Sequence, residues 1–484
     1  MRGLISALAF GVLTASAATV PNDAQTVQHV LNRITFGLRD GDVERVQAKG
    51  LQRYIEEQLR PDRIPDPAMA ARLDGLKSIT MSTREIAATF EAPLVEARRA
   101  KKQDAKADPD PDAPKMPNPV QQRANGVLVE LGEQKILRAV YSERQLQEVL
   151  TDFWFNHFNV DARKGRDRFM LTEYEREVIR PHVLGSFRDL LGATAKSPAM
   201  LFYLDNWMSV DPNGPHPVQT PPRYARGPFG GRMVVPGTPR QPAQGKNAPK
   251  GLNENYGREL LELHTLGVDG GYSQHDVTEV ARAFTGWTIE NPQKGGGFVF
   301  RPQVHDTGQK VVLGHLIKAG GGESDGEQVL DIVSKHPSTA RFIATKLARR
   351  FVSDTPPPAL IDRAAKKFMD TNGDLREVTR TILLSPEFLS PDAFNAKAKT
   401  PFDFLVSSLR TSGADVKDAR PFVRTMQELG MPLYQCQPPT GYKDTADAWI
   451  NTGSLVARMN VAVRLSSGDE KLAQQLGSPE FQRR

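Results

Sequence analysis

The residues best suited to chemistry lie between Asn253 and Trp287, where acid, amide, imidazole and arginine groups fall on two predicted helices joined by a glycine turn. On a helix of 3.6 residues per turn, Glu259 lies inside an apolar stripe. The stripe consists of Leu252, Tyr256, Leu260, Leu263 and Leu266. A buried carboxylate must be paired, hydrogen-bonded, metal-bound or protonated. Glu259, with Asn255 one turn before it, is therefore a candidate catalytic residue, although a structural tie to a loop or an arginine explains the position equally.

Three histidines could supply the imidazole groups of the same site. His157 lies on the apolar stripe of a predicted helix over 142–158, His264 follows Glu259, and His305 lies in a predicted turn. Imidazole and carboxylate groups can bind zinc or another first-row metal, or act as a general acid and base. A divalent metal is thus an expected cofactor class of undetermined identity. The alternative is a hydrogen-bonded core histidine, which apolar helix faces readily contain.

Polar residues near these positions are candidate binding residues. Asn159 and Asp161 lie in a polar loop that follows the helix with His157. Arg258 is spaced i,i+4 from Glu254 on the solvent-facing side, which is typical of an exposed ion pair. The segment 269–276 matches the second half of a calcium-binding loop but not the first. Helix capping by Ser273, with Asp276 three residues later, explains the same letters.

The composition and the amino-terminal sequence limit the possible classes of protein. Residues 1–17 have the charged start, short apolar run and small-residue cleavage site of a signal peptide, which predicts export to the periplasm or beyond. No later apolar run is long enough to span a membrane. The 63 Lys and Arg residues exceed the 57 Asp and Glu residues by only six, without a dense basic block, so we expect no nucleic-acid partner. The single cysteine, Cys436, is expected to be either buried or unusually reactive, and the frequent burial of free cysteine favours the first.

Helical periodicity dominates the chain, so we expect a mainly α, multi-helix globular protein, with residues 18–484 as one unit. Two long exposed loops are predicted near 104–119 and 211–250, where proline, glycine and charged residues interrupt the pattern. One small β-hairpin is expected to pair 298–300 with 311–313 across the turn that contains His305.

Several strings of the sequence together resemble one protein family. They are Leu31-Asn-Arg-Ile-Thr-Phe-Gly37, Asp152-Phe-Trp-Phe-Asn-His-Phe-Asn-Val160, the segments 253–267, 281–287, 336–343 and 385–388, and Pro432-Leu-Tyr-Gln-Cys-Gln-Pro-Pro-Thr-Gly-Tyr442. The chain is similar, over nearly its whole mature length, to the bacterial domain of unknown function 1800 (DUF1800) family. The resemblance implies an exported, mainly helical protein, and it brings no established catalytic residues.

Two hypotheses of function follow from these observations. The first is an exported hydrolase or metal-assisted enzyme, whose catalytic groups come from separate helices. The second is a non-enzymatic cell-envelope module that recognises a polysaccharide, a peptide or a co-exported partner through Tyr, Trp and Arg side chains. The relative positions of Glu259 and His157, and the presence of a cavity beside them, distinguish the two.

Overall fold

Helices make up most of the computed structural model, which describes residues 20–104, 118–214 and 251–484 together with four short strands between 218 and 240. The mainly α prediction is confirmed. The amino-terminal helices are α1 (Ala24–Ile34), α2 (Asp42–Lys49), α3 (Leu51–Gln58), α4 (Pro67–Leu73), α5 (Thr83–Ile86), α6 (Ala92–Asp104), α7 (Pro119–Tyr141) and α8 (Gln145–His157). The central helices are α9 (Leu171–Glu173), α10 (Phe187–Lys196), α11 (Pro198–Tyr203), α12 (Asn255–Glu259), α13 (Gln274–Ala283) and α14 (Ser324–Ser334). The carboxyl-terminal helices are α15 (Pro337–Phe351), α16 (Pro358–Asp370), α17 (Leu375–Leu383), α18 (Pro401–Thr411), α19 (Arg420–Glu428), α20 (Ala446–Trp449), α21 (Thr452–Ser466) and α22 (Glu470–Gly477).

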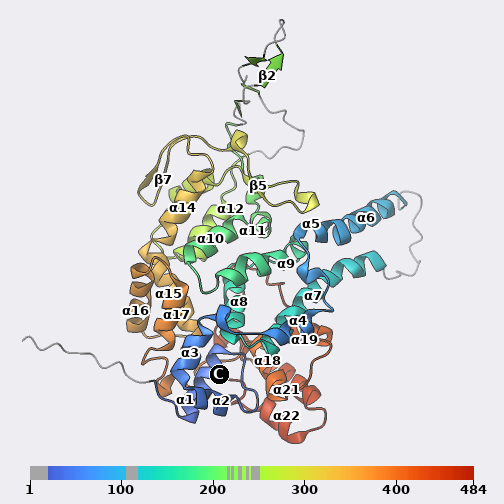
Figure 1. Ribbon diagram of the computed structural model, residues 1–484, viewed down its shortest axis with the longest axis vertical. Helices are drawn as coiled ribbons and strands as arrows, with labels where there is room; N and C mark the ends of the chain where they lie inside the picture. The colour runs from blue at the N-terminus through green and yellow to red at the C-terminus, as the bar shows by residue number, and fades with distance from the viewer. Residues whose placement is uncertain are drawn as a thin grey trace, which may run out of the picture.

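Helix α8 runs through the middle of the molecule, with the other helices arranged around it (Figure 1). Its apolar side chains, Leu146, Val149, Leu150 and Trp154, are fully buried. They belong to one connected core that runs from Val27 in α1 to Leu476 in α22. A second, small cluster packs α6 against the first half of α7, which project together as an arm to the right of the view. Both ends of the described chain therefore contribute to the core that holds α8.

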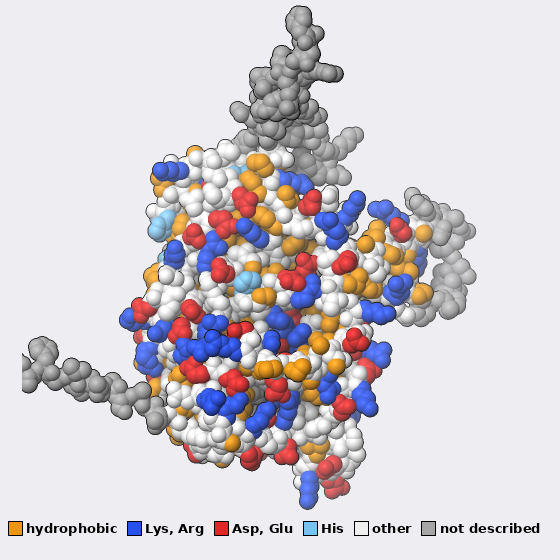
Figure 2. All heavy atoms as spheres, viewed as in Figure 1, with side chains coloured by type: hydrophobic (Ala, Val, Ile, Leu, Met, Phe, Trp, Pro, Cys, Tyr) orange, Lys and Arg blue, Asp and Glu red, His pale blue; other side chains and the backbone are white. Residues whose placement is uncertain are grey.

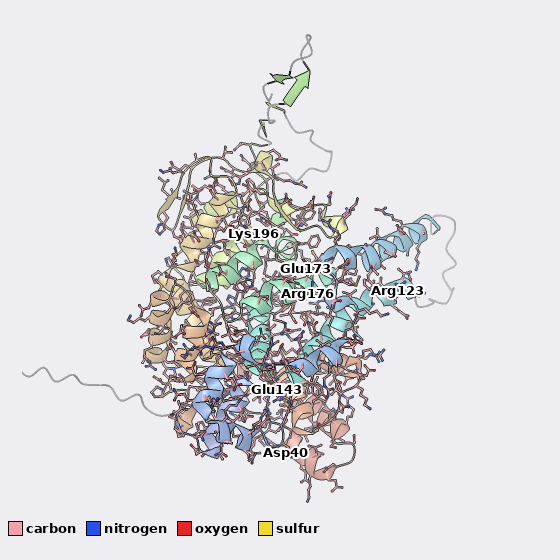
Figure 3. All side chains as sticks on the ribbon, viewed as in Figure 1. Asp40, Arg123, Glu143, Glu173, Arg176 and Lys196 are labelled. Atoms are coloured by element: carbon pink, nitrogen blue, oxygen red, sulfur yellow. The ribbon has the colours of Figure 1, made fainter. Side chains whose placement is uncertain are left out.

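Ion pairs join several of these helices at the surface. Lys196, which Figure 3 labels in the upper half of the molecule, connects α10 to α14 because its Nζ lies 2.6 Å from Glu327 Oε1. Such exposed pairs contribute at most about 1 kcal/mol each. Figure 2 shows acidic and basic side chains interspersed over the face in view, in keeping with the small net charge of the sequence.

The β-structure consists of short antiparallel pairs. In the described residues, β1 (Val218–Gln219) pairs with β4 (Pro239–Arg240), and β2 (Arg223–Arg226) pairs with β3 (Arg232–Val235). Further along the chain, β5 (Trp287–Ile289) pairs with β6 (Phe298–Phe300), and β7 (Lys310–Val312) pairs with β8 (His315–Ile317).

The predicted pairing of 298–300 with 311–313 was therefore wrong. Lys310–Val312 instead folds back on His315–Ile317 through a two-residue turn, in which Leu313 and Gly314 have φ of 48° and 77°. Positive φ at both central residues matches the right-handed twist of a hairpin. Each of the two predicted strands thus pairs with a segment that is nearer in sequence than the other predicted strand is.

The two predicted loops fall largely on residues outside the description. Residues 105–117 of the first loop are not described, nor are those of 215–250 that lie outside β1 to β4. None of the described helices has the length and apolar character needed to cross a bilayer.

We expect the contact between Gly326 of α14 and Trp287 to be intolerant of a side chain. A Cβ at Gly326 would lie 2.5 Å from Trp287 Cζ2, and both residues are buried. Gly326→Ala should lower the free energy of unfolding by about 1–3 kcal/mol, as overpacking does. The matched control is Gly126→Ala in α7, where no atom lies within 4 Å of the added Cβ. This control should stabilise by about 0.5–1 kcal/mol, because alanine is the better helix former. Urea unfolding measures the free energy of unfolding of both variants. Equal changes in the two variants would contradict the prediction.

Candidate functional site

A π-helical segment decides which residues of the acid-rich helix face the core. Helix α12 ends at Glu259 and continues as a π-helix over Leu260–Thr265. The wider turn changes the helical register, so that Leu261 and His264 are buried and Leu263 is only half-buried. The predicted stripe assumed 3.6 residues per turn throughout, which explains why it included Leu263. π-helical turns of this kind occur often at functional sites.

Glu259 is half-buried and has no hydrogen bond or ion pair to another described residue. Glu259 is therefore less enclosed than its place in the predicted apolar stripe implied. Burial and the neighbouring Glu262 raise the pKa of Glu259. Asn255 is exposed at the start of α12, with its Nδ2 3.4 Å from Leu204 O. Arg258 lies 3.8 Å from Glu254, and this exposed ion pair was predicted.

The buried polar centre lies instead at His157, the last residue of α8. Its Nε2 is 3.1 Å from the backbone oxygen of His264, and its Nδ1 is 2.9 Å from Lys346 Nζ in α15. A carbonyl can only accept, so Nε2 carries the ring hydrogen and Nδ1 presents a lone pair to the lysine. The two predicted histidines thus meet, and a lysine that was not predicted completes the group.

Burial keeps both imidazoles neutral. It lowers the pKa of His157 well below its ordinary range, with a further contribution from the positive charge of Lys346, and lowers the pKa of His264 to about 3. Burial, assisted by the charge of Arg349, also lowers the pKa of Lys346 to about 8. The lysine is therefore the group of this cluster that changes its charge near neutral pH.

Lys346 and His157 line a cavity of about 310 Å³, which we call the lysine pocket. Its walls come from the end of α8, from α15 and from the segment 440–445. The lining residues are Phe153, Asn156, His157, Lys346, Arg349, Thr440, Tyr442, Lys443, Asp444 and Thr445. The pocket therefore joins two of the sequence strings that characterise this chain, 152–160 and 432–442.

Hydrogen bonds between asparagine side chains and the backbone fix the loop wall of the lysine pocket against α8. Asn156 donates to Tyr442 O at 2.8 Å and accepts from Tyr442 N at 2.7 Å. Asn159 donates to the backbone oxygens of Cys436 and Pro438, both at 2.9 Å. Gly441 has a φ of 74°, and a Cβ there would lie 2.2 Å from Asn156 O. Asn159, a predicted binding residue, thus holds the wall of the pocket in place.

Asp444 connects the lysine pocket to a buried ionic network. One of its carboxylate oxygens lies 3.8 Å from Arg350, 3.5 Å from Lys397 and 3.6 Å from Arg484. Arg350 also donates to both oxygens of Asp403, at 3.2 and 3.4 Å. This network, defined as Arg350, Lys397, Asp403, Asp444 and Arg484, fixes one end of the loop wall.

His305 belongs to a different cluster in the structure. Its Nδ1 donates to Thr285 O at 2.8 Å, and its Nε2 lies 3.2 Å from Asp325. Lys310 donates to the same Asp325 oxygen at 2.8 Å. All of these side chains are buried, so the cluster ties the β7 segment to α13 and α14.

The remaining predicted residues have local partners. Asp161 is buried and is paired with Arg163 at 3.0 Å. Ser273 and Asp276 form the predicted capping box at the start of α13. Cys436 is buried as expected, and burial raises the pKa of its thiol to about 11. Among the described residues, no group of three or more His, Cys, Asp or Glu side chains is arranged to hold a metal ion.

The fold and the cavity define a mainly helical protein with a lysine–histidine pair at the wall of a pocket. The family described as "Protein of unknown function (DUF1800)" matches residues 29–483. The chain therefore belongs to the DUF1800 family, as its sequence strings indicate. Among curated proteins and among solved structures, none matches the chain.

We expect Lys346 to make the free energy of unfolding depend on pH in the alkaline range. The folded pKa of about 8 lies below the ordinary value of 10.5, so the folded chain binds fewer protons than the unfolded chain between these values. Below pH 8 the lysine is charged in both states, so the folded state bears the full cost of burying that charge. This cost is relieved, and the free energy of unfolding rises, as the pH increases to 10.5. At about 1.4 kcal/mol per pKa unit, the cost is about 3 kcal/mol.

Replacement of Lys346 by methionine should remove this dependence. The stability of Lys346→Met relative to the unchanged protein should fall by about 3 kcal/mol between pH 8 and 10.5. Urea unfolding at intervals across this range measures the difference. Lys318→Met is the control, because an exposed side chain keeps its hydration on folding. If the difference in the free energy of unfolding between Lys346→Met and the unchanged protein is constant with pH, the lowered pKa of Lys346 is contradicted.

Proposed function

We propose that this chain is an exported hydrolase in which Lys346, held by His157, transfers protons in the lysine pocket. The observation that carries the proposal is the 2.9 Å contact between Lys346 Nζ and His157 Nδ1 at the wall of a cavity. In the described residues, no carboxylate forms an ion pair with Lys346. A lysine of lowered pKa in a pocket is a recognised form of general base.

The geometry supports a specific division of roles. Neutral Lys346 has two N–H groups and one lone pair. One N–H donates to His157 Nδ1, which leaves the lone pair free to take a proton from a water molecule. That water attacks the scissile carbonyl carbon, and the ammonium of Lys346 then returns the proton to the leaving group. His157 acts as a positioning residue, because its own hydrogen is donated to His264 O.

The charges around the pocket favour a substrate with an acidic group. Arg349 and Lys443 line the cavity beside Lys346. Lys443 is paired with Asp447 at 3.5 Å, and the carboxylate of Asp444 pairs with Lys397, so Arg349 is the cation beside Lys346 without a carboxylate partner among the described residues. The volume of about 310 Å³ lies at the small end of ligand sites. The proposed substrate class is therefore a small ester or amide with a carboxylate near the scissile bond. No step of this mechanism passes through a metal ion.

Hydrolysis of acidic and neutral esters tests this function. The p-nitrophenyl monoesters of succinate and glutarate serve as substrates, with p-nitrophenyl butyrate as the neutral counterpart. We expect kcat/KM to rise with pH around a midpoint near 8, since the neutral lysine is the active form. Lys346→Met should reduce kcat/KM for the acidic esters by at least about 100-fold.

Lys318→Met, at an exposed lysine, should leave the rate unchanged. Absence of hydrolysis above background for all three esters would overturn the proposal. Equal rates for Lys346→Met and the unchanged protein would overturn it as well.

Export is the second part of the proposal, and it rests on residues 1–17, which lie outside the described residues. Expression of the full chain in a Gram-negative bacterium, followed by amino-terminal sequencing of the periplasmic fraction, tests it. We expect a mature chain that starts at Ala18. Recovery of an uncleaved chain in the cytoplasm alone would contradict export.

A further inference from the structure

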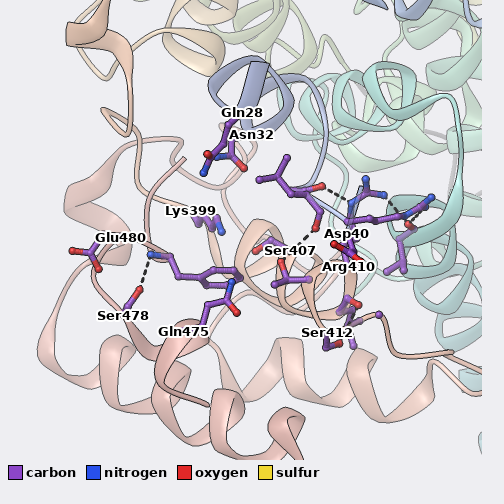
Figure 4. Close-up of a pocket in the computed structure, with 18 of the residues that line it drawn as sticks. Gln28, Asn32, Asp40, Lys399, Ser407, Arg410, Ser412, Gln475, Ser478 and Glu480 are labelled. Atoms are coloured by element: carbon purple, nitrogen blue, oxygen red, sulfur yellow. Dashed lines mark hydrogen bonds between the residues drawn. The ribbon is translucent and has the colours of Figure 1, made fainter. Parts of the chain in front are cut away.

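A second and larger cavity, which we call the terminal cleft, lies between the first and last parts of the chain. It has a volume of about 1010 Å³ and is lined by the turn after α1, by α18 and by the residues after α22 (Figure 4). The sequence string Leu31–Gly37, which the lysine pocket does not involve, contributes Asn32 and Gly37 to this cleft. This sequence string thus forms part of the wall of the terminal cleft.

Hydroxyl and amide side chains provide much of the polar lining of the terminal cleft. Figure 4 shows them entering from separate segments of the chain. They are Gln28, Asn32, Ser407, Ser412, Gln475 and Ser478. Such groups both donate and accept, so they suit a ligand that presents many hydroxyl groups.

Lys399 places an amino group without a carboxylate partner at the same cleft, and burial lowers the pKa of this group to about 7. The residue is only 5% exposed, and its Nζ lies 3.6 Å from the centroid of the Phe481 ring. Within the part of the chain that is described, Nζ donates no hydrogen bond and forms no ion pair. An ammonium with a ring as its partner keeps hydrogen-bonding capacity for an acidic group.

Two buried lysines in the described part of the chain have carboxylate partners, whereas Lys346 in the lysine pocket has none. Lys310 donates to Asp325, and Lys397 donates to Asp354. Loss of either carboxylate would leave an uncompensated buried cation, which is strongly destabilising. Lys399 departs from this pattern at the wall of a large cavity. The missing carboxylate is what a bound ligand would provide.

We propose that the terminal cleft binds an acidic oligosaccharide. The carboxylate or other acidic substituent of one sugar pairs with Lys399, and the hydroxyl and amide groups of the cleft bind the sugar hydroxyls. The volume of about 1010 Å³ is at the upper end for ligand sites, which fits several linked sugars better than one small anion. This site is independent of the reaction proposed for the lysine pocket.

Gly37 shapes the inner wall of the cleft. Its φ is 111°, and a Cβ at this position would lie 2.7 Å from Ser407 Cβ. The glycine therefore allows the turn after α1 to lie directly against α18. That contact sets the position of Ser407, one of the proposed sugar-binding hydroxyl groups.

The experiment compares acidic and neutral glycans on a printed array. The array carries oligosaccharides of three to six sugars that contain uronate, sialate or sulfate, next to their neutral counterparts. We expect the protein to bind acidic members at least 10-fold more tightly than the neutral counterparts. Lys399→Met should weaken binding of the acidic members at least 10-fold, because the cation that pairs with the acidic group is lost.

Two further measurements separate recognition from folding. Thermal unfolding should show Lys399→Met to be as stable as the unchanged protein or more so, since no carboxylate loses its partner. Lys346→Met should keep full glycan binding, so a failure of the hydrolase proposal leaves this result unaffected. Binding to no glycan, equal binding to acidic and neutral glycans, or unchanged binding by a folded Lys399→Met would each overturn the proposal.

Discussion

The buried pairing of Asp403 with Arg350 is the interaction on which both cavities depend. Arg350 neutralises Asp403, which lowers the pKa of that carboxyl, and it also approaches Asp444 at the lysine pocket. Asp403 lies in α18, which lines the terminal cleft, and accepts from the backbone of Thr400, the residue after Lys399. Charges buried this deeply are stable only as a complete set. The network therefore holds α15, α18 and the 440–445 loop in one arrangement.

Helical periodicity was sufficient to predict the fold class, because the apolar stripes of α8, α13 and α15 are long and regular. The capping box of Ser273 and the burial of Cys436 were also predictable from local chemistry. Pairing of the short strands was not predictable. A three-residue strand has too little pattern to choose a partner, and the Leu313–Gly314 turn, with a leucine at positive φ, is not a typical hairpin sequence.

The candidate site was predicted only in part, for physical reasons. His157 was named from its apolar surroundings and His264 from its place in the acid-rich segment, and the structure brings them together. Glu259 was expected in the core because a regular helical period of 3.6 residues per turn was assumed. The π-helix that begins directly after Glu259 interrupts this period. Lys346 lies 189 residues from His157 in sequence and resembles an ordinary lysine on an amphipathic helix. Only the packing of α15 against α8 gives it a pocket and an imidazole partner.

The identity of that partner determines what the lysine can do. A carboxylate beside Lys346 would stabilise the ammonium and keep it charged, as an acidic partner does for any cation. His157 is neutral because it is buried, so it accepts a hydrogen bond without opposing the loss of the lysine's proton. It also fixes the direction of Nζ. A buried imidazole therefore gives Lys346 an orientation and leaves its pKa low, whereas an ion pair would give orientation only together with a permanent charge.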